Sequence, residues 1–142
     1  MQIQRIQTLW LLIATILMGV FVFMPFGTFE VVADGQEDIV TLTTCKEFGV
    51  LVPAAVAAIL LLIDIFMYKN LPSQRSVLVI GIILTLCTIC TVCFTLFKGL
   101  EGYEPHFSWF DIMVPAALIF ELLAMKGINH DQKLLASYNR LR

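Results

Sequence analysis

Two long stretches without a single charged side chain constrain this chain more than any other feature of its sequence. They are Ile6–Met24 and Ser76–Phe97, with 19 and 22 residues. Since a helix rises 1.5 Å per residue, each is about 28 Å or longer and can cross the apolar core of a bilayer. The apolar region of a secretory signal is shorter, so we interpret Ile6–Met24 as a full span. The chain is 59% hydrophobic and its charges cluster between the apolar stretches, which indicates an integral membrane protein.

The sequence predicts one integral membrane domain with four spans, at residues 6–24, 48–68, 76–97 and about 108–125. Asp64 lies in the second span and Glu121 in the fourth, so the fourth is predicted from its length and flanking residues more than from its hydropathy. The remaining segments are two outer loops, one inner loop and a cytoplasmic tail, at residues 25–47, 98–107, 69–75 and 126–142 respectively.

The distribution of basic residues predicts the orientation of these spans. Lys46 and Lys98 lie on one side, and the other seven of the nine Lys and Arg residues lie on the opposite side: Arg5, Lys69, Arg75, Lys126, Lys133, Arg140 and Arg142. Segments rich in Lys and Arg stay in the cytoplasm, so both termini are predicted to be cytoplasmic. The predicted fold class is an all-α membrane protein, a bundle of four transmembrane helices.

One small element is expected on each side of this bundle. In the first outer loop, Phe29–Ala33 and Ile39–Leu42 flank Asp34-Gly35, a dipeptide that favours a tight turn, so a β-hairpin is predicted. A lone hairpin is marginal in water and should pack against helix ends or a partner. In the tail, residues 134–142 place leucine and tyrosine at helical spacing among basic residues. This pattern predicts a short amphipathic helix at the membrane surface or in a partner's groove.

A short motif occurs near the start of the second and the fourth span, as Val52-Pro53-Ala54-Ala55 and Val114-Pro115-Ala116-Ala117. It indicates either two helical hairpins in parallel repeat or a chance match, since Pro and Ala are common in membrane helices. Pro53 and Pro115 would each remove one interior hydrogen bond and bend the helix. The alanines are small enough for the second and fourth spans to approach closely.

Each copy of this motif follows the sequence pattern of a capping box. The two pairs are Thr44 with Glu47 and Ser108 with Asp111. In a capping box the hydroxyl and the carboxylate accept hydrogen bonds from backbone N–H groups that have no partner inside the helix. Helix starts are therefore predicted at both places.

Glu121 and Asp64 are the candidate proton or ion site, because ionisable residues inside a span are costly and commonly functional. Each precedes a lysine, Lys126 or Lys69, by five residues, so each is expected only about 7.5 Å from the inner basic ring. The two carboxyl groups could then share a proton. The alternative is a structural carboxylate that pairs with Arg5 or Arg75 or reaches the interface.

Cys87, Cys90 and Cys93 have a spacing that can suggest a metal site, but they lie in the middle of a span. Metal sites with thiolate ligands usually need a loop that folds four ligands around the ion. Threonines alternate with these cysteines along the same span, so the predicted role of the cysteines is a face for close helix packing. Cys45 is the only other cysteine and lies near the outer boundary, which disfavours a disulfide oxidoreductase.

Several classes of function find no support in the sequence. His106 and His130 are expected on opposite sides of the membrane, so they do not form a haem or metal pair. No nucleophile elbow, phosphate-binding loop or zinc-binding helix motif is present. The net charge of −2 gives no basic face for nucleic acid. We therefore expect no cofactor, no metal, no nucleic-acid partner and no enzymatic activity.

Short motifs at the ends of the spans resemble one known family. They are Gln4–Thr8, Tyr68–Asn70, Asp131–Leu134 and Arg140–Arg142. The layout is similar to that of the family described as domain of unknown function 4293, small four-span inner-membrane proteins of Bacteroidota-type bacteria. The resemblance implies a location in the bacterial inner membrane and four helices, and it supplies no catalytic residues.

Two functions fit these expectations. The first is a non-catalytic accessory or scaffold subunit of a membrane assembly, because the chain is small, lacks a catalytic motif and carries a hairpin that needs support. The second is a proton-coupled transporter with Glu121 and Asp64 as its exchange site. Four spans enclose little volume, so a transporter of this kind would be a homo-oligomer. The expected partners are therefore the lipid bilayer and either another membrane protein or further copies of this chain.

Overall fold

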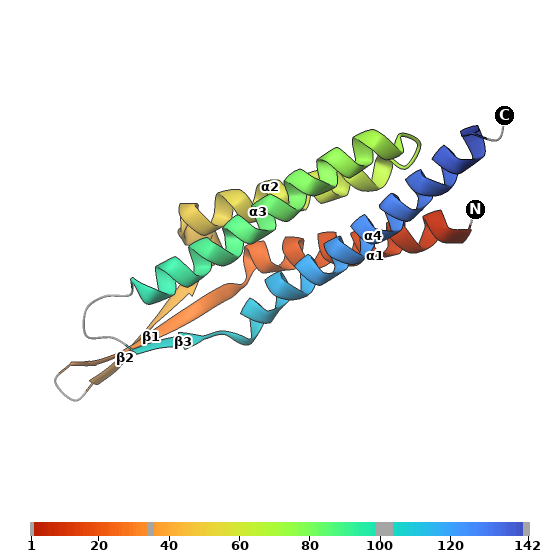
Figure 1. The fold of residues 1–142 in the computed structure, drawn as a ribbon. Helices are drawn as coiled ribbons and strands as arrows, with labels where there is room; N and C mark the ends of the chain where they lie inside the picture. Colours follow the sequence, from red (N-terminus) through yellow and green to blue (C-terminus); the bar gives the residue numbers. More distant parts are fainter. Residues whose placement is uncertain (1, 34–35, 99–103, 141–142) are drawn as a thin grey trace.

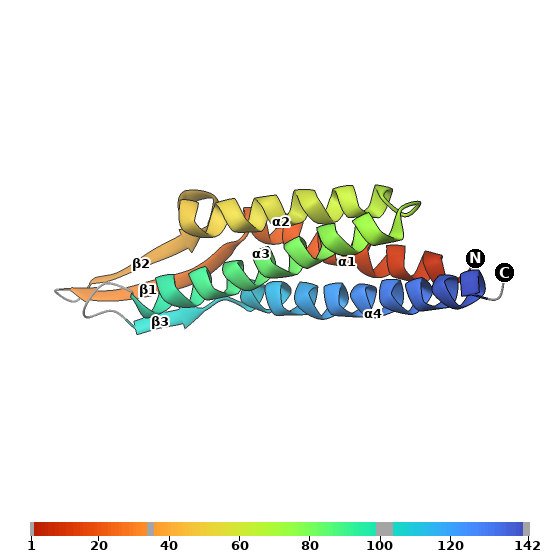
Figure 2. The same cartoon turned by 45° about the horizontal axis from the view of Figure 1, so that its top comes forward.

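Four helices lie side by side in the computed structural model and give the molecule an elongated shape (Figures 1 and 2). The structure describes residues 2–33, 36–98 and 104–140, with side chains for 6–28, 41–98 and 106–138. The helices are α1 (Gln2–Phe23), α2 (Phe48–Phe66), α3 (Leu71–Phe97) and α4 (Met113–Arg140). Helix α1 packs against α2 and α4, and α3 also packs against α2 and α4. Both chain termini lie at the end of the molecule opposite the sheet (Figure 1).

Helices α1, α3 and α4 extend further at this end than the predicted spans, whereas α2 already ends at Phe66. Helix α3 begins at Leu71, with Pro72 in its first turn, so only a short loop joins α2 to α3. Proline is favoured there because the first turn has no helical partner for its missing N–H. The predicted helix in the tail is present through Arg140, but it is the end of α4 and not a short helix of its own. No proline interrupts residues 126–140, so nothing in this segment stops the helix.

A three-stranded antiparallel sheet projects from the other end of the molecule (Figure 1). Strands β1 (Pro25–Ala33) and β2 (Gln36–Thr43) form the predicted hairpin, which is thereby confirmed; its Asp34-Gly35 turn lies outside the described residues. Strand β3 (Glu104–Phe107) pairs with β1 and was not predicted. The strand order β2-β1-β3 joins the two loops that were predicted to be outer in one sheet.

The helix starts agree with the predicted caps at only one of the two places. The Ser108 N–H donates to the Asp111 carboxyl group over 2.9 Å, and the Ser108 hydroxyl accepts from the Phe110 N–H, so this capping box is confirmed. It caps a short 3₁₀ helix, η2 (Trp109–Ile112), that leads into α4. The other prediction is wrong, because the Thr44 hydroxyl donates to the Met24 carbonyl and no side chain caps α2.

The two prolines lie at different places in their helices. Pro53 lies inside α2, as expected. Pro115 is the third residue of α4, so it lies in the first turn and not in the helix interior. The first turn of a helix tolerates proline because its N–H groups have no partner within the helix.

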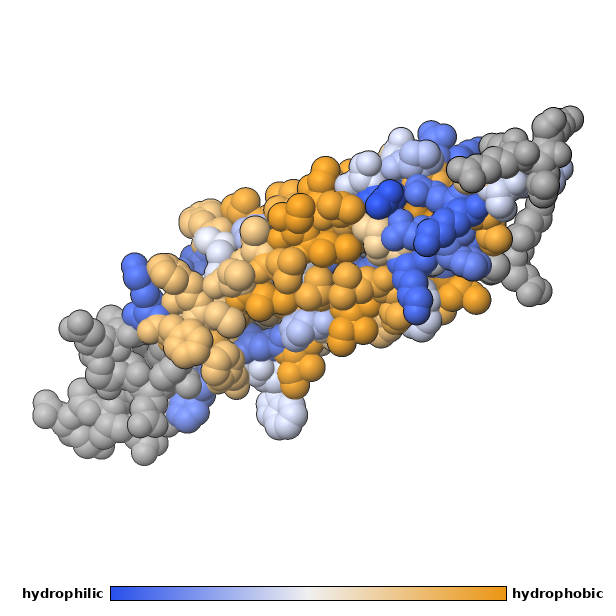
Figure 3. All heavy atoms as spheres, in the orientation of Figure 1, coloured by the Kyte–Doolittle hydropathy of each residue, from blue (hydrophilic) through white to orange (hydrophobic). Residues whose placement is uncertain are grey.

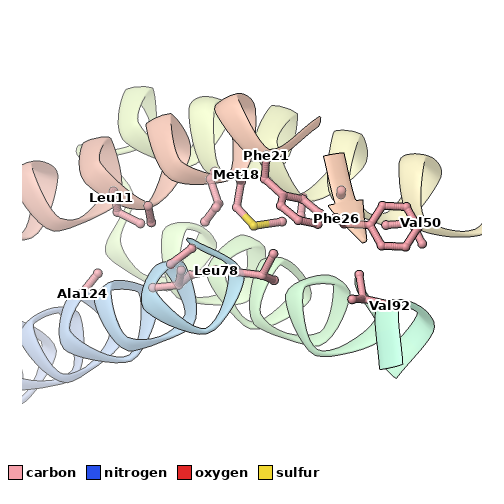
Figure 4. Close-up of a cluster of buried hydrophobic side chains, with 14 of the residues drawn as sticks. Leu11, Met18, Phe21, Phe26, Val50, Leu78, Val92 and Ala124 are labelled. Atoms are coloured by element: carbon pink, nitrogen blue, oxygen red, sulfur yellow. The ribbon is translucent and has the colours of Figure 1, made fainter. Parts of the chain in front are cut away.

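The core lies between the helices and ends where β1 begins. Figure 4 shows Met18 and Phe21 of α1 and Phe26 of β1 along this core, with Leu78 and Val92 of α3 on its other side. Buried alanines let the backbones approach closely: Ala14, Ala54, Ala57, Ala117 and Ala124. The predicted close approach of the second and fourth spans is wrong: in the described residues α2 and α4 are diagonal, and each packs against α1 and α3.

The outer surface of the helices is apolar over much of their length (Figure 3). Three helices are long and apolar enough to cross a membrane, at Ile6–Phe23, Phe48–Phe66 and Leu71–Phe97. Many large hydrophobic side chains on them are exposed, as a bilayer requires and water does not favour. The chain is therefore a helical protein with three candidate membrane spans and a small sheet.

Candidate functional site

Glu121 lies on the inward face of α4 and is fully buried. Its Oε1 is 2.7 Å from the Thr85 hydroxyl of α3. The same hydroxyl also lies 3.1 Å from the Gly81 carbonyl. The Thr85 hydroxyl thus donates to Glu121 of the neighbouring helix while staying within reach of the carbonyl one turn earlier in α3. This contact ties Glu121 to α3.

Glu121 lies level with the middle of α3. Its partner Thr85 is near the middle of α3, which runs from Leu71 to Phe97. At the end of the molecule away from the sheet, the Gln132 amide donates to the Leu71 carbonyl over 3.0 Å. Glu121 is eleven residues before Gln132, about 16 Å along the helix. Lys126 follows Glu121 by five residues on the same continuous helix, so the two residues are about 7.5 Å apart along its axis, and α4 continues well beyond Lys126.

Asp64 is the second buried carboxyl group and lies two residues before the end of α2. The side chain is fully buried, and among the described residues neither carboxyl oxygen has a hydrogen-bond partner. The backbone carbonyl of Asp64 accepts a hydrogen bond of 3.4 Å from Gln74 of α3. A buried polar group without a hydrogen-bond partner is costly, so Asp64 is placed here at the expense of stability.

The two carboxyl groups do not form one site. Asp64 contacts α3 at Gln74 and Glu121 contacts α3 at Thr85, eleven residues apart. This separation is about 16 Å along the helix, too far for a shared proton. The predicted shared site is therefore wrong. Of the two arginines proposed as ion-pair partners, Arg75 is exposed and the side chain of Arg5 lies outside the described residues.

A third polar contact in the interior was not predicted. The Gln7 amide of α1 donates to the Asp131 carboxyl group of α4 over 2.7 Å, and both side chains are buried. Gly127 makes room for this pair, because a Cβ at that position would be 2.7 Å from the Gln7 Cγ. Gln7 and Asp131 belong to the two end motifs Gln4–Thr8 and Asp131–Leu134. The presence of both residues in these motifs was the only feature of the sequence that pointed to their contact.

The cysteines of α3 do not form a packing face within this chain. Cys87 and Cys90 are exposed and Cys93 is partly exposed. The buried face of α3 passes instead through Gly81, Thr85 and Thr88, which is the correction to the prediction. Among the described residues, no group of three His, Cys, Asp or Glu side chains could hold a metal ion.

A comparison with protein-family models matches residues 3–141 to the model described as domain of unknown function 4293. This chain belongs to that family. The match includes the sheet and all of the four helices except Gln2, so nearly the whole of the fold described above lies within the family's domain. Comparisons with curated proteins and with solved structures give no match. The family description assigns no activity, so a function has to be argued from the geometry.

Proposed function

We propose that the chain crosses the bacterial inner membrane four times, with both termini in the cytoplasm. The fourth span would be α4, whose low hydropathy has a local explanation: Glu121, the only charged residue between Asp111 and Lys126, points into the interior. The side chains exposed on this part of α4 are apolar, including Ile119 and Leu122. The excess of basic residues at the end away from the sheet supports a cytoplasmic location for that end.

The proposed function is that of a non-catalytic subunit of a membrane assembly. The observation that carries this proposal is the outer sheet, which joins both outer loops and has β2 and β3 at its edges. Strand β2 pairs only with β1 in the part of the chain that the structure describes. The outer edge of β2 therefore offers backbone N–H and carbonyl groups to a strand of another protein.

The buried carboxyl groups fit this proposal as structural elements. Glu121 joins α4 to α3 through Thr85, and both Glu121 and Asp64 are completely shielded from solvent. A hydrogen bond between helices inside a membrane contributes about 0.6 kcal/mol on average. Because these carboxyl groups are buried, a partner would bind at the outer surface of the molecule, and in particular at the edge of the sheet.

Site-specific photo-crosslinking in native membranes tests this function. A photoreactive residue is placed at Thr41, which is exposed on β2, and as a matched control at Ser73, which is exposed at the opposite end of the molecule. The proposal predicts one recurrent crosslinked membrane protein from position 41 only, which also remains bound at near-stoichiometric amount in mild detergent. Crosslinks from both positions to many proteins, or from neither position, would refute it.

A second candidate is a homo-oligomeric proton-coupled transporter, and Glu121 is the observation that favours it. The Oε2 atom of Glu121 is buried near the middle of the helices and has no hydrogen-bond partner among the described residues. A reversible proton site needs a carboxyl group of this kind. Proton-linked flux in vesicles should then disappear in Glu121→Gln and persist in Glu47→Gln, which removes a carboxyl group at the outer end. Equal flux in both variants would exclude this candidate.

A further inference from the structure

A surface groove of about 840 Å³ lies between α3 and α4 at the end near the chain termini. One part of its lining is apolar and consists of Val79, Ile80 and Leu135, all of them exposed. The other part contains Arg75 and Gln132. The groove therefore combines an apolar surface, which suits a hydrocarbon chain, with a cation beside it.

A second groove of about 430 Å³ continues from the first and adds another cation. The two grooves share Arg75 and Gln132, and the second is also lined by Lys133 of α4. Arg75 and Lys133 thus flank one continuous hollow from two different helices. No acidic side chain of the described residues lines either groove. The charge of the hollow is therefore positive, which complements a phosphate group.

The depth of the groove agrees with a lipid ligand. Arg75 immediately precedes the uncharged stretch Ser76–Phe97, so it lies at the boundary between the apolar and the polar part of α3. Hydrophilic residues also gather near this end of the molecule beside the apolar band (Figure 3). A phospholipid has its phosphate at this boundary and its acyl chains on the apolar side. Basic pockets between helices at the cytoplasmic face are suited to anionic headgroups.

We propose that this groove binds an anionic phospholipid of the inner leaflet. The phosphate contacts Arg75 and Lys133, and an acyl chain lies over Val79, Ile80 and Leu135. The term inner leaflet depends on the orientation proposed above, whereas the binding itself does not. The site favours anionic over zwitterionic lipids. The two cations have no acidic side chain beside them, and an anionic headgroup neutralises their positive charge better than a zwitterionic headgroup does.

Native mass spectrometry of the purified full chain tests this site with phosphatidylglycerol and phosphatidylcholine as probes. Arg75→Gln combined with Lys133→Gln should weaken phosphatidylglycerol binding about 25-fold, roughly fivefold for each cation. The matched control is Lys69→Gln with Lys126→Gln, which removes two basic side chains that line neither groove. The control should change binding about twofold at most, and phosphatidylcholine binding should be weak and equal in all forms. All four side chains are exposed, so both double variants should fold.

Three results would overturn the proposal. Equal loss of phosphatidylglycerol binding in both double variants would mean a diffuse basic surface and no groove site. Displacement of the lipid by millimolar inorganic phosphate alone would mean a simple anion site. Unchanged lipid binding in Arg75→Gln/Lys133→Gln, with loss of a co-purified protein, would assign the groove to a protein partner. Because the measurement is made in detergent, it does not depend on membrane orientation or on the partner of the outer sheet.

Discussion

Replacing Gly127 by alanine should reveal how α1 and α4 hold each other at the end of the molecule away from the sheet. The new Cβ would be 2.7 Å from the Gln7 Cγ and 3.1 Å from its Nε2, closer than carbon atoms pack without moving. Gln7 must therefore shift, and its hydrogen bond of 2.7 Å to Asp131 is lost or distorted. The same pair joins residues 124 positions apart in the sequence.

Two opposing terms determine the size of the effect. Alanine is favoured over glycine inside a helix by about 1 kcal/mol. Loss of a buried hydrogen bond to a carboxylate costs about 1.5–3 kcal/mol. The free energy of unfolding should therefore fall by about 0.5–2 kcal/mol in Gly127→Ala. When Gln7 is first replaced by alanine the clash disappears, so Gly127→Ala should then raise stability by up to about 1 kcal/mol.

The assay is reversible unfolding of the full chain in mixed micelles, with the four forms of the Gln7/Gly127 double-mutant cycle compared. Gly19→Ala is the matched control, because a Cβ at Gly19 in α1 would meet nothing within 4 Å. Gly19→Ala should stabilise or leave the protein unchanged in every background. The reasoning is refuted if Gly127→Ala has the same effect with and without Gln7.

Two further predictions concern single contacts in the interior. Thr85→Val removes the hydrogen bond to Glu121 and should lower the free energy of unfolding by about 0.6–1.7 kcal/mol. The control is Thr91→Val, whose hydroxyl bonds within α3 and which should change the free energy of unfolding by less than about 0.5 kcal/mol. Equal effects of the two variants in the same micelle assay would contradict this role of Thr85. Gly27→Ala should destabilise by about 1–3 kcal/mol, because its Cβ would be 2.6 Å from the buried Leu96 side chain. The cost should shrink when Leu96 is also alanine, and an unchanged cost would show that the strain lies elsewhere.

The features of the fold that depend on local patterns could be predicted from the sequence. The long uncharged stretches predicted α1 and α3, and alternating residues around Asp34-Gly35 predicted β1 and β2. Strand β3 was missed because it has only four residues and one of them is Pro105, a residue that usually argues against a strand. The strand forms because the edge of β1 is free to pair with it. Since β1 is far from β3 in the sequence, this pairing cannot be seen in the residues around β3.

The two buried carboxyl groups could be picked out from the sequence, but their arrangement could not. An ionisable side chain inside an apolar stretch is visible in the sequence, so Glu121 and Asp64 were found. Their depth depends on where α3 and α4 meet, and Thr85 as partner follows only from that register. The cysteine and threonine faces of α3 have similar helical spacing and similar size. The sequence alone therefore did not tell which of the two faces packs inside the molecule.

The proposed four-span topology depends on the passage of α4 through the membrane, and single-cysteine labelling tests it most directly. The four native cysteines are replaced by serine, and one cysteine is introduced either at Thr41 in the sheet or at Ser137 near the end of α4, both exposed positions. Intact spheroplasts are treated with a membrane-impermeant maleimide. We predict that Thr41→Cys is labelled at once and that Ser137→Cys is labelled only after lysis. Labelling of Ser137→Cys in intact spheroplasts would contradict a fourth span and cytoplasmic C-terminus.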